Sequence, residues 1–309
     1  MNPFGTKAST VPPEAQADAL LDELGRRMLK RRVDALKSLP TFPESVVRIN
    51  QIITQDGPKE SLRKIADAIE TDPVLCARIL RLVNSAFYGV SGAIVTVFDA
   101  LLMLGLDIVK GLILSTTVSD VFAGRNATLN GLWEHSYGAA VAASALGKTL
   151  GLSKVEELSA AALMHDLGKM VLASQLEDEY RAVVAHAVER RTTVRQAEHQ
   201  LLGVTHDEIG HWLVLRWKLP ASLAEPIARH HEPTKAGKFT DAAAVVHVAD
   251  LMIRGYGFGF AGDRVMPALD DGAWRHLGLT NDKLRTAIRR LQADLHEALR
   301  HVHLIAGGA

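Results

Sequence analysis

The stretch AALMHDLGKMVL at residues 161–172 places two polar side chains, His165 and Asp166, inside an otherwise apolar helical pattern. An ionised carboxylate buried in such surroundings is strongly destabilising unless it is paired, hydrogen-bonded or bound to a metal. The neighbouring imidazole, when neutral, is a good ligand for Zn, Fe, Mn or Ni. Because adjacent residues on a helix point about 100° apart, both side chains can reach one ion lying against the helix. Taken alone, the dipeptide fits a surface pair or a satisfied His–Asp pair better than a metal site.

Further histidines and one more aspartate fall on or beside helical patterns between residues 132 and 251. They are His135, His206, the adjacent pair His230–His231, and Asp250. Together with His165 and Asp166 they supply five imidazoles and two carboxylates, enough for two metals when water or phosphate completes the coordination. We interpret the seven residues as a candidate site for divalent metal, with Fe, Mn, Zn, Ni and Mg all open. The alternative is a structural network of satisfied polar side chains in the core.

The apolar pattern is helical almost throughout and predicts an all-α fold, because no useful run of period-two alternation is found in the sequence. A polar connector is expected at 123–130, and a long loop at 255–278. The expected helices cover approximately residues 13–36, 43–53, 61–69, 72–84, 95–105, 106–122, 131–150, 155–174, 176–189, 193–202, 206–217, 220–231, 240–254 and 281–303.

Composition excludes several classes of protein. The 309 residues carry 35 Lys and Arg against 35 Asp and Glu, so the formal net charge of 0 gives no general attraction to nucleic acid or acidic lipid. A single cysteine, Cys76, excludes an internal disulfide framework and a CxxC zinc site. The first residues lack the apolar segment of a secretory signal, and charged residues interrupt the longest apolar region, 95–118. We expect a cytoplasmic protein with no membrane span and no nucleic-acid partner.

The order H…HD…H…HH…D resembles the HD superfamily of metal-dependent phosphohydrolases, and the wider pattern resembles its HDOD (HD-related output domain) family. The resemblance covers about residues 34–254 and implies an all-α fold, with an N-terminal helical bundle packed on an HD-like helical core. It also implies a regulatory or output role in bacterial signalling. The segments that carry it, besides 161–172, are LPTFPESVVRI (39–49), LRKIADAIETDPVLCARILRLVNSAFYG (62–89), FDALLMLGLDIVKGLIL (98–114), LWEHSYGAAVAASALGKTLGL (132–152), GVTHDEIGHWLVLRWKLP (203–220) and IARHHEP (227–233).

The resemblance also implies roles for individual residues. All seven candidates match ligand positions of bimetallic relatives, which include the HD-GYP cyclic-dinucleotide phosphodiesterases. Asp166 would be the bridging carboxylate, and Lys169 matches the lysine that contacts substrate phosphate, so these two are the candidate catalytic residues. Two departures matter: the sequence GYGF at 255–258 is not the GYP motif, and Gly131 stands where some bimetallic relatives have a glutamate. The first argues against cyclic-dinucleotide hydrolysis, and the second against a third metal or that ligand geometry.

The expected organisation is an N-terminal helical extension at 1–33, a helical subdomain at 34–125, an HD-like metal-binding subdomain at 126–255, and a loop with a C-terminal helix at 256–309. We favour a regulatory protein with a mono- or dinuclear metal site. It would act through a bound phosphate-type ligand or through partners such as a sensor kinase or cyclic-nucleotide signalling components. A homodimer stays open, although intramolecular packing is the favoured fate of the apolar faces of 13–36 and 280–303. The alternative is an active metal-dependent phosphohydrolase or phosphodiesterase acting on a nucleotide or another phosphoester.

Overall fold

The computed structural model describes residues 62–70, 94–106, 127–216 and 219–306, together with the positions 31, 52, 76, 79–80, 83–84 and 108–109. The chain divides into two compact units, residues 1–39 and 40–309. Apart from Arg31, the predicted helix 13–36 and its basic cluster lie outside the described residues, as do the connector residues 123–126 and most of the predicted helices 43–53, 72–84 and 106–122.

Two helices of the predicted N-terminal subdomain are described, α3 (Leu62–Glu70) and α5 (Val97–Leu104), and they pack against each other. Helix α3 is amphipathic and buries Ile65 and Ile69, which lie one turn apart. Helix α5 begins where the Thr96 side chain accepts a hydrogen bond from the backbone of Asp99, and it ends at Gly105, whose φ is 83°. Both helices follow the predicted ranges, including the break near Gly105.

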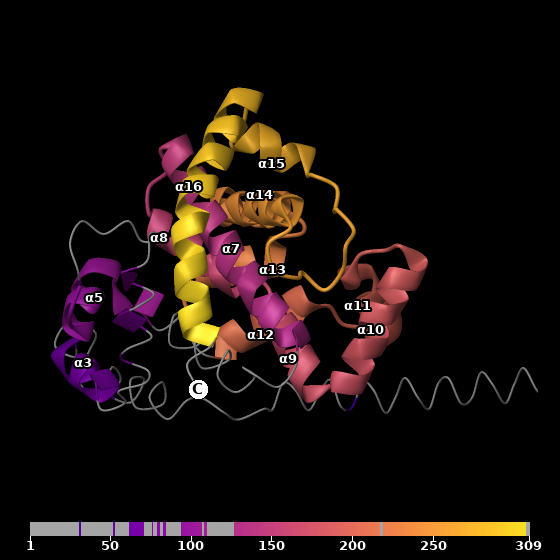
Figure 1. Cartoon of the computed structure of the whole chain (residues 1–309), viewed down its shortest axis with the longest axis horizontal. Coiled ribbons are helices and arrows are strands. Elements are labelled where there is room, and N and C mark those ends of the chain that lie inside the picture. Colours follow the sequence, from indigo (N-terminus) through magenta and orange to yellow (C-terminus); the bar gives the residue numbers. More distant parts are fainter. Residues whose placement is uncertain are drawn as a thin grey trace, which may run out of the picture. The chain divides into compact units, whose positions relative to one another are not determined.

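The central element is the long helix α7 (Ala127–Leu150), which packs against α8 (Val155–Met164), α14 (Thr240–Tyr256) and α16 (Asn281–Ala306) (Figure 1). Small residues allow this crowding, because the segment Ala139–Ala143 is fully buried and consists of alanines and one valine. Helix α16 turns Ala287, Leu291 and Leu295 inward, and it packs against α7. The intramolecular packing expected for the 280–303 face is therefore confirmed for its described side chains.

The remaining helices surround the region where the predicted site residues lie. Helix α12 (His206–Arg216) packs against both α9 (Leu167–Gln175) and α13 (Ala221–Arg229), while α10 (Glu177–Arg190) packs with α11 (Val194–Leu202) (Figure 1). Two short 3₁₀ helices, Pro233–Lys235 and Gly237–Phe239, lead into α14. The described residues contain helices, turns and loops but no strand, so the predicted all-α class is confirmed. None of the described helices combines the length and the apolar character that crossing a membrane requires.

Three boundaries differ from the prediction. The helix expected over 155–174 is interrupted at His165–Asp166, because the His165 side chain bonds to the carbonyl of Ala162, the acceptor that Asp166 N–H would use in a continuous helix. The loop expected over 255–278 contains α15 (Asp271–His276), which begins where Asp270 caps Ala273 N–H at 2.8 Å. The last residues of the connector expected at 123–130 already belong to α7, which begins at Ala127.

Candidate metal centre

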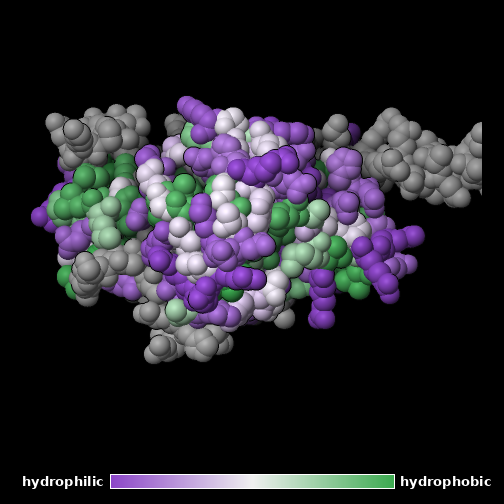
Figure 2. Space-filling model, turned by 90° about the horizontal axis from the view of Figure 1, so that it is seen from above, coloured by the Kyte–Doolittle hydropathy of each residue, from purple (hydrophilic) through white to green (hydrophobic). Residues whose placement is uncertain are grey.

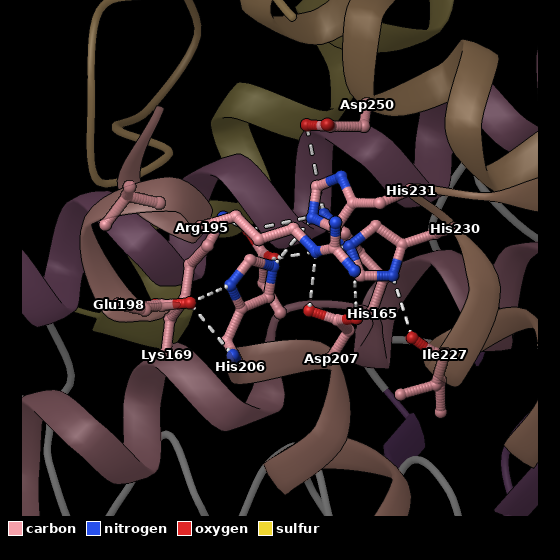
Figure 3. A network of polar contacts seen from close by, with 12 residues as sticks. His165, Lys169, Arg195, Glu198, His206, Asp207, Ile227, His230, His231 and Asp250 are labelled. Atoms are coloured by element: carbon pink, nitrogen blue, oxygen red, sulfur yellow. Dashed lines mark hydrogen bonds and ion pairs between the residues drawn. The ribbon is translucent and has the colours of Figure 1, made fainter. Parts of the chain in front are cut away.

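The structure brings all seven predicted residues together in one place, although they come from several helices and lie up to 115 positions apart. Figure 3 shows five of them, namely His165, His206, His230, His231 and Asp250. His135 lies in α7, His206 at the start of α12, and Asp250 in α14. His165 and Asp166 occupy the break between α8 and α9, while His230 and His231 follow the end of α13. Only His231 is partly exposed; the other six are buried.

Two groups of three ligand atoms have no residue in common, and a third, His165, Asp166 and His230, links them. The first contains His135, His165 and Asp250, and the second contains His206, His230 and His231; within each group, the atoms lie within 4.8 Å of one another. In the first group, His135 Nε2 is 2.9 Å and His165 Nε2 is 3.9 Å from Asp250 Oδ1. In the second, the Nε2 atoms of His206 and His231 are 2.9 Å apart.

Asp166 lies between these groups and turns one carboxylate oxygen to each. Its Oδ2 is 3.3 Å from His165 Nε2 and 3.7 Å from His135 Nε2. Its Oδ1 is 3.4 Å from His206 Nε2 and 4.0 Å from His230 Nε2. This arrangement has the form of a carboxylate that contacts two neighbouring cation positions.

The hydrogen bonds at Nδ1 orient three of the imidazoles. His165 Nδ1 donates to Ala162 O at 2.7 Å and His230 Nδ1 donates to Ile227 O at 2.8 Å, since a carbonyl oxygen can only accept. His206 Nδ1 lies 2.6 Å from Glu198 Oε2, a buried carboxylate on α11 (Figure 3). With the proton on Nδ1, the Nε2 atom of each neutral ring carries the lone pair, and in all three residues Nε2 faces the centre.

Several of the inward atoms have no hydrogen-bond partner among the described residues. They are Nε2 of His165 and His230 and Oδ1 of Asp166, all of them buried, while Nε2 of His135 faces Asp250 Oδ1 at 2.9 Å. Leaving buried polar atoms unsatisfied is destabilising, and native proteins rarely tolerate several in one place. Nitrogen and carboxylate donors that converge without other partners fit divalent transition metals. The donor set is therefore suited to cations.

Burial and neighbouring charges favour the protonation states that metal binding needs. Burial, together with the neighbouring rings of His165 and His206, lowers the pKa of His230 to about 3, and burial also lowers the pKa of His135. Although burial opposes it, the positive charges around Asp166 hold the pKa of that carboxyl well below its ordinary value. His165 differs, because the adjacent Asp166 outweighs burial and raises the pKa of that imidazole.

Lys169 lies inside the same cluster. Its side chain is fully buried, and its Nζ donates to Asp166 Oδ2 at 2.7 Å. The prediction that residue 169 lies one turn after Asp166 and points toward the same place is thus confirmed in geometry.

Sequence reasoning missed the residues that support this cluster. Glu198 holds both the ring and the backbone N–H of His206, and Arg254 Nε donates to Asp250 Oδ1 at 2.9 Å. Arg254 also bonds to the buried Asp263, which accepts from Val194 N at the start of α11. The spacing of Arg254 four residues after Asp250 was a usable signal, whereas nothing in the sequence links Glu198 to His206. His247 donates from Nδ1 to the backbone carbonyl of His230 at 2.8 Å.

Gly131 has no room for the glutamate found at that position in some bimetallic relatives. A Cβ added there would lie 2.7 Å from Cβ of Phe260, whose N–H donates to Gly131 O. The loop after α14 therefore occupies this side of α7.

Comparisons with known proteins place the chain in a family. The model of the HDOD domain matches residues 39–233. An uncharacterized protein of Treponema pallidum (strain Nichols) is 26% identical over 223 residues, which are 72% of this chain and 43% of that protein, so the chain spans less than half of this relative.

Two solved structures share the fold. An HDOD domain protein of unknown function from Geobacter sulfurreducens is 26% identical, with a TM-score of 0.63 over 92% of this chain and 97% of its own. A protein of Marinobacter aquaeolei VT8, provisionally described as acting in signal transduction, is 19% identical, with a TM-score of 0.63 over 92% of this chain and 66% of its own. Since the family model covers more than half of the residues, this chain belongs to the HDOD family.

Proposed function

We propose that this chain is a bacterial signal-transduction protein whose cluster of histidines and aspartates holds two divalent cations and takes a phosphate-type ligand. The observation that carries the proposal is the position of Asp166, whose two oxygens face two separate groups of imidazoles. The unpartnered Nε2 atoms of His165 and His230 support it, because cations would satisfy them. The signalling part draws on family membership and on the description of the Marinobacter protein.

Each group of ligand atoms would hold one cation. His135, His165 and Asp250 supply the first position, and His206, His230 and His231 the second, with Asp166 shared. Divalent cations bound there would lower the pKa of a bound water and offset negative charge on phosphoryl oxygens. Lys169 would add a buried positive charge beside Asp166 for the same anion.

A second candidate function is hydrolysis of a phosphoester, and the buried Lys169 favours it. A purely structural centre has no need for an ammonium group beside the shared carboxylate, whereas phosphoryl transfer gains from positive charge at the reacting phosphate.

Sensor kinases and cyclic-nucleotide signalling components are the partners that we propose for the regulatory role.

Metal analysis of protein purified without a His-tag tests the proposal. We expect up to two equivalents of Fe, Mn, Zn, Ni or Mg per chain in the wild type and none in the double variant His165→Ala, Asp166→Ala. The variant His199→Ala is the control, because that histidine is exposed on α11 and belongs to neither group. Unchanged metal content in the double variant would contradict the proposal.

The substitution Lys169→Met separates ligand binding from metal binding. We expect the metal content to stay and the affinity for inorganic phosphate to fall at least tenfold, because the lysine would contact the anion rather than the cations. Isothermal titration calorimetry measures this, with Lys154→Met as the control at an exposed position. Full phosphate affinity in Lys169→Met would remove this residue from the ligand site.

A further inference from the structure

A pocket of about 550 Å³ adjoins the metal centre on the side of the loop that follows α14. His135 belongs to its wall and also to the first group of ligand atoms, so the pocket and the first cation position share this residue. Its volume lies within the range of small-molecule sites, roughly 300–1,000 Å³. The segment 257–266, which contains the repeated pattern GFGF, supplies most of the lining.

The lining mixes apolar and polar surface and carries one positive charge that no described residue pairs. Phe258, Phe260 and Met266 supply aromatic rings and a thioether. Arg254 pairs with Asp263 at 3.0 Å and with Asp250 at 2.9 Å, so its positive charge is already engaged. Arg264 is exposed and makes no ion pair with any described residue. Rings and a thioether attract flat aromatic groups, and a guanidinium attracts anions.

The loop that builds the pocket is anchored to α7 and α11 and is not free to collapse into the space. Gly259 has a φ of 69°, and a Cβ there would lie 2.3 Å from the backbone nitrogen of His135. Phe260 N–H donates to Gly131 O at 2.8 Å. At the other end, Asp263 accepts from Val194 N at 2.7 Å. Such anchoring keeps a binding site preorganised and lowers the entropy cost of binding.

We propose that this pocket receives the aromatic group of a phosphoester whose phosphate lies at the metal centre. The inference rests on the proposed function, since it places the phosphate beside Asp166 and Lys169. It adds the class of ligand: an aromatic phosphoester rather than inorganic phosphate or an aliphatic ester. The face drawn in Figure 2 mixes hydrophilic residues with smaller hydrophobic areas. The proposal rests on the residues that line the pocket.

The test compares phenylphosphonate with methylphosphonate, which differ in the aromatic ring and cannot be hydrolysed as esters. Calorimetry on the metal-loaded, full-length protein measures both affinities. We expect phenylphosphonate to bind at least tenfold more tightly, because the ring gains contact with Phe258, Phe260 and Met266. Equal affinities would overturn the inference while leaving the proposed metal centre and phosphate site standing.

Variants at exposed positions test whether the phenyl ring of phenylphosphonate lies in the pocket. Met266→Asp puts a charge into the pocket wall, and we expect the preference for phenylphosphonate to fall below threefold. The matched control is Leu269→Asp, an exposed apolar residue nearby that does not line the pocket. Arg264→Ala should lower the affinities for both phosphonates by a similar factor, and Arg275→Ala, at an exposed position on α15, is its control.

Three further results decide the matter. A preference that survives Met266→Asp would overturn the inference. A preference that survives the double variant His165→Ala, Asp166→Ala would overturn the placement of the phosphate at the centre. Binding of neither ligand by metal-loaded wild type would overturn the inference and the phosphate part of the proposed function together. Thermal unfolding of each variant verifies its fold, and the wild-type comparison stays decisive if a variant does not fold.

Discussion

Three imidazoles of the centre are oriented by hydrogen bonds from their Nδ1 atoms, on the side of each ring that faces away from the centre. For His165 and His230 the acceptors are backbone carbonyls three residues earlier, so the local helix geometry itself fixes the ring. For His206 the acceptor is the carboxylate of Glu198, which comes from a different helix. Because Glu198 is a charged partner, it also makes the ring a better electron donor.

We therefore expect Glu198→Gln to weaken metal binding by about 10- to 100-fold while the protein stays folded. The glutamine oxygen can still accept from His206 Nδ1, but the negative charge is lost. Competition with a chromophoric chelator measures the affinity. Glu189→Gln, at an exposed position on α10, is the control. Unchanged affinity in Glu198→Gln would show that the negative charge of Glu198 does not strengthen metal binding by His206.

The sequence indicated the candidate ligands better than the residues that hold them in position. Histidines and aspartates inside apolar helical patterns stand out because burying them is destabilising, and all seven such residues meet in the structure. Glu198 and Asp263 also lie buried, but they fall in segments that read as ordinary polar sequence, and their partners are 8 and 69 positions away. Contacts between distant polar residues depend on the packing of whole helices, which periodicity does not encode.

Helix positions were predicted within a few residues wherever an apolar stripe or a capping residue marks them. Helix α11, expected at 193–202, runs from Val194 to Leu202 behind a Thr193 cap. The break at His165–Asp166 was missed because the apolar pattern continues through it and only a side-chain hydrogen bond reveals it. That break gives Asp166 a φ of −100° and ψ of 14°.

The contact between α9 and α12 depends on Gly168, because the helices approach so closely that no side chain fits. A Cβ at residue 168 would lie 2.0 Å from the carbonyl oxygen of His206, a backbone atom next to a candidate ligand. We expect Gly168→Ala to destabilise the protein by about 2 kcal/mol or more and to reduce its metal content, since α12 must move away from Asp166.

Chemical denaturation and metal analysis test this, with Gly255→Ala in α14 as the control. A Cβ at residue 255 would meet only Met266 Cε at 3.5 Å, so the better helix propensity of alanine should leave stability unchanged or raise it by up to about 1 kcal/mol. Equal stability of Gly168→Ala and wild type would show that α9 and α12 can separate without loss.

The domain boundaries predicted at 33/34, 125/126 and 255/256 stay predictions, as do the partners and the homodimer.

One property of the whole chain follows from its buried histidines. Burial lowers the pKa values of His135, His230, His231 and His247, while Asp166 outweighs burial and raises the pKa of His165. In the unfolded chain all of them return to about 6.5. Below that pH, the unfolded state therefore binds more protons than the metal-free native state does.

We expect the free energy of unfolding of metal-free protein to fall between pH 7 and pH 5, because unfolding takes up protons in that range. His230, with a native pKa of about 3, contributes about 2 kcal/mol of this loss at pH 5, since each pH unit below 6.5 corresponds to about 1.4 kcal/mol. The raised pKa of His165 acts in the opposite direction, but it is one residue against four. Urea denaturation in the presence of a chelator measures the loss, which should be smaller in His230→Gln and unchanged in His199→Gln, a substitution at an exposed position. A free energy of unfolding that rises on acidification would mean that these imidazoles are protonated in the native state. The metal-free centre would then not present the neutral imidazoles that metal binding needs.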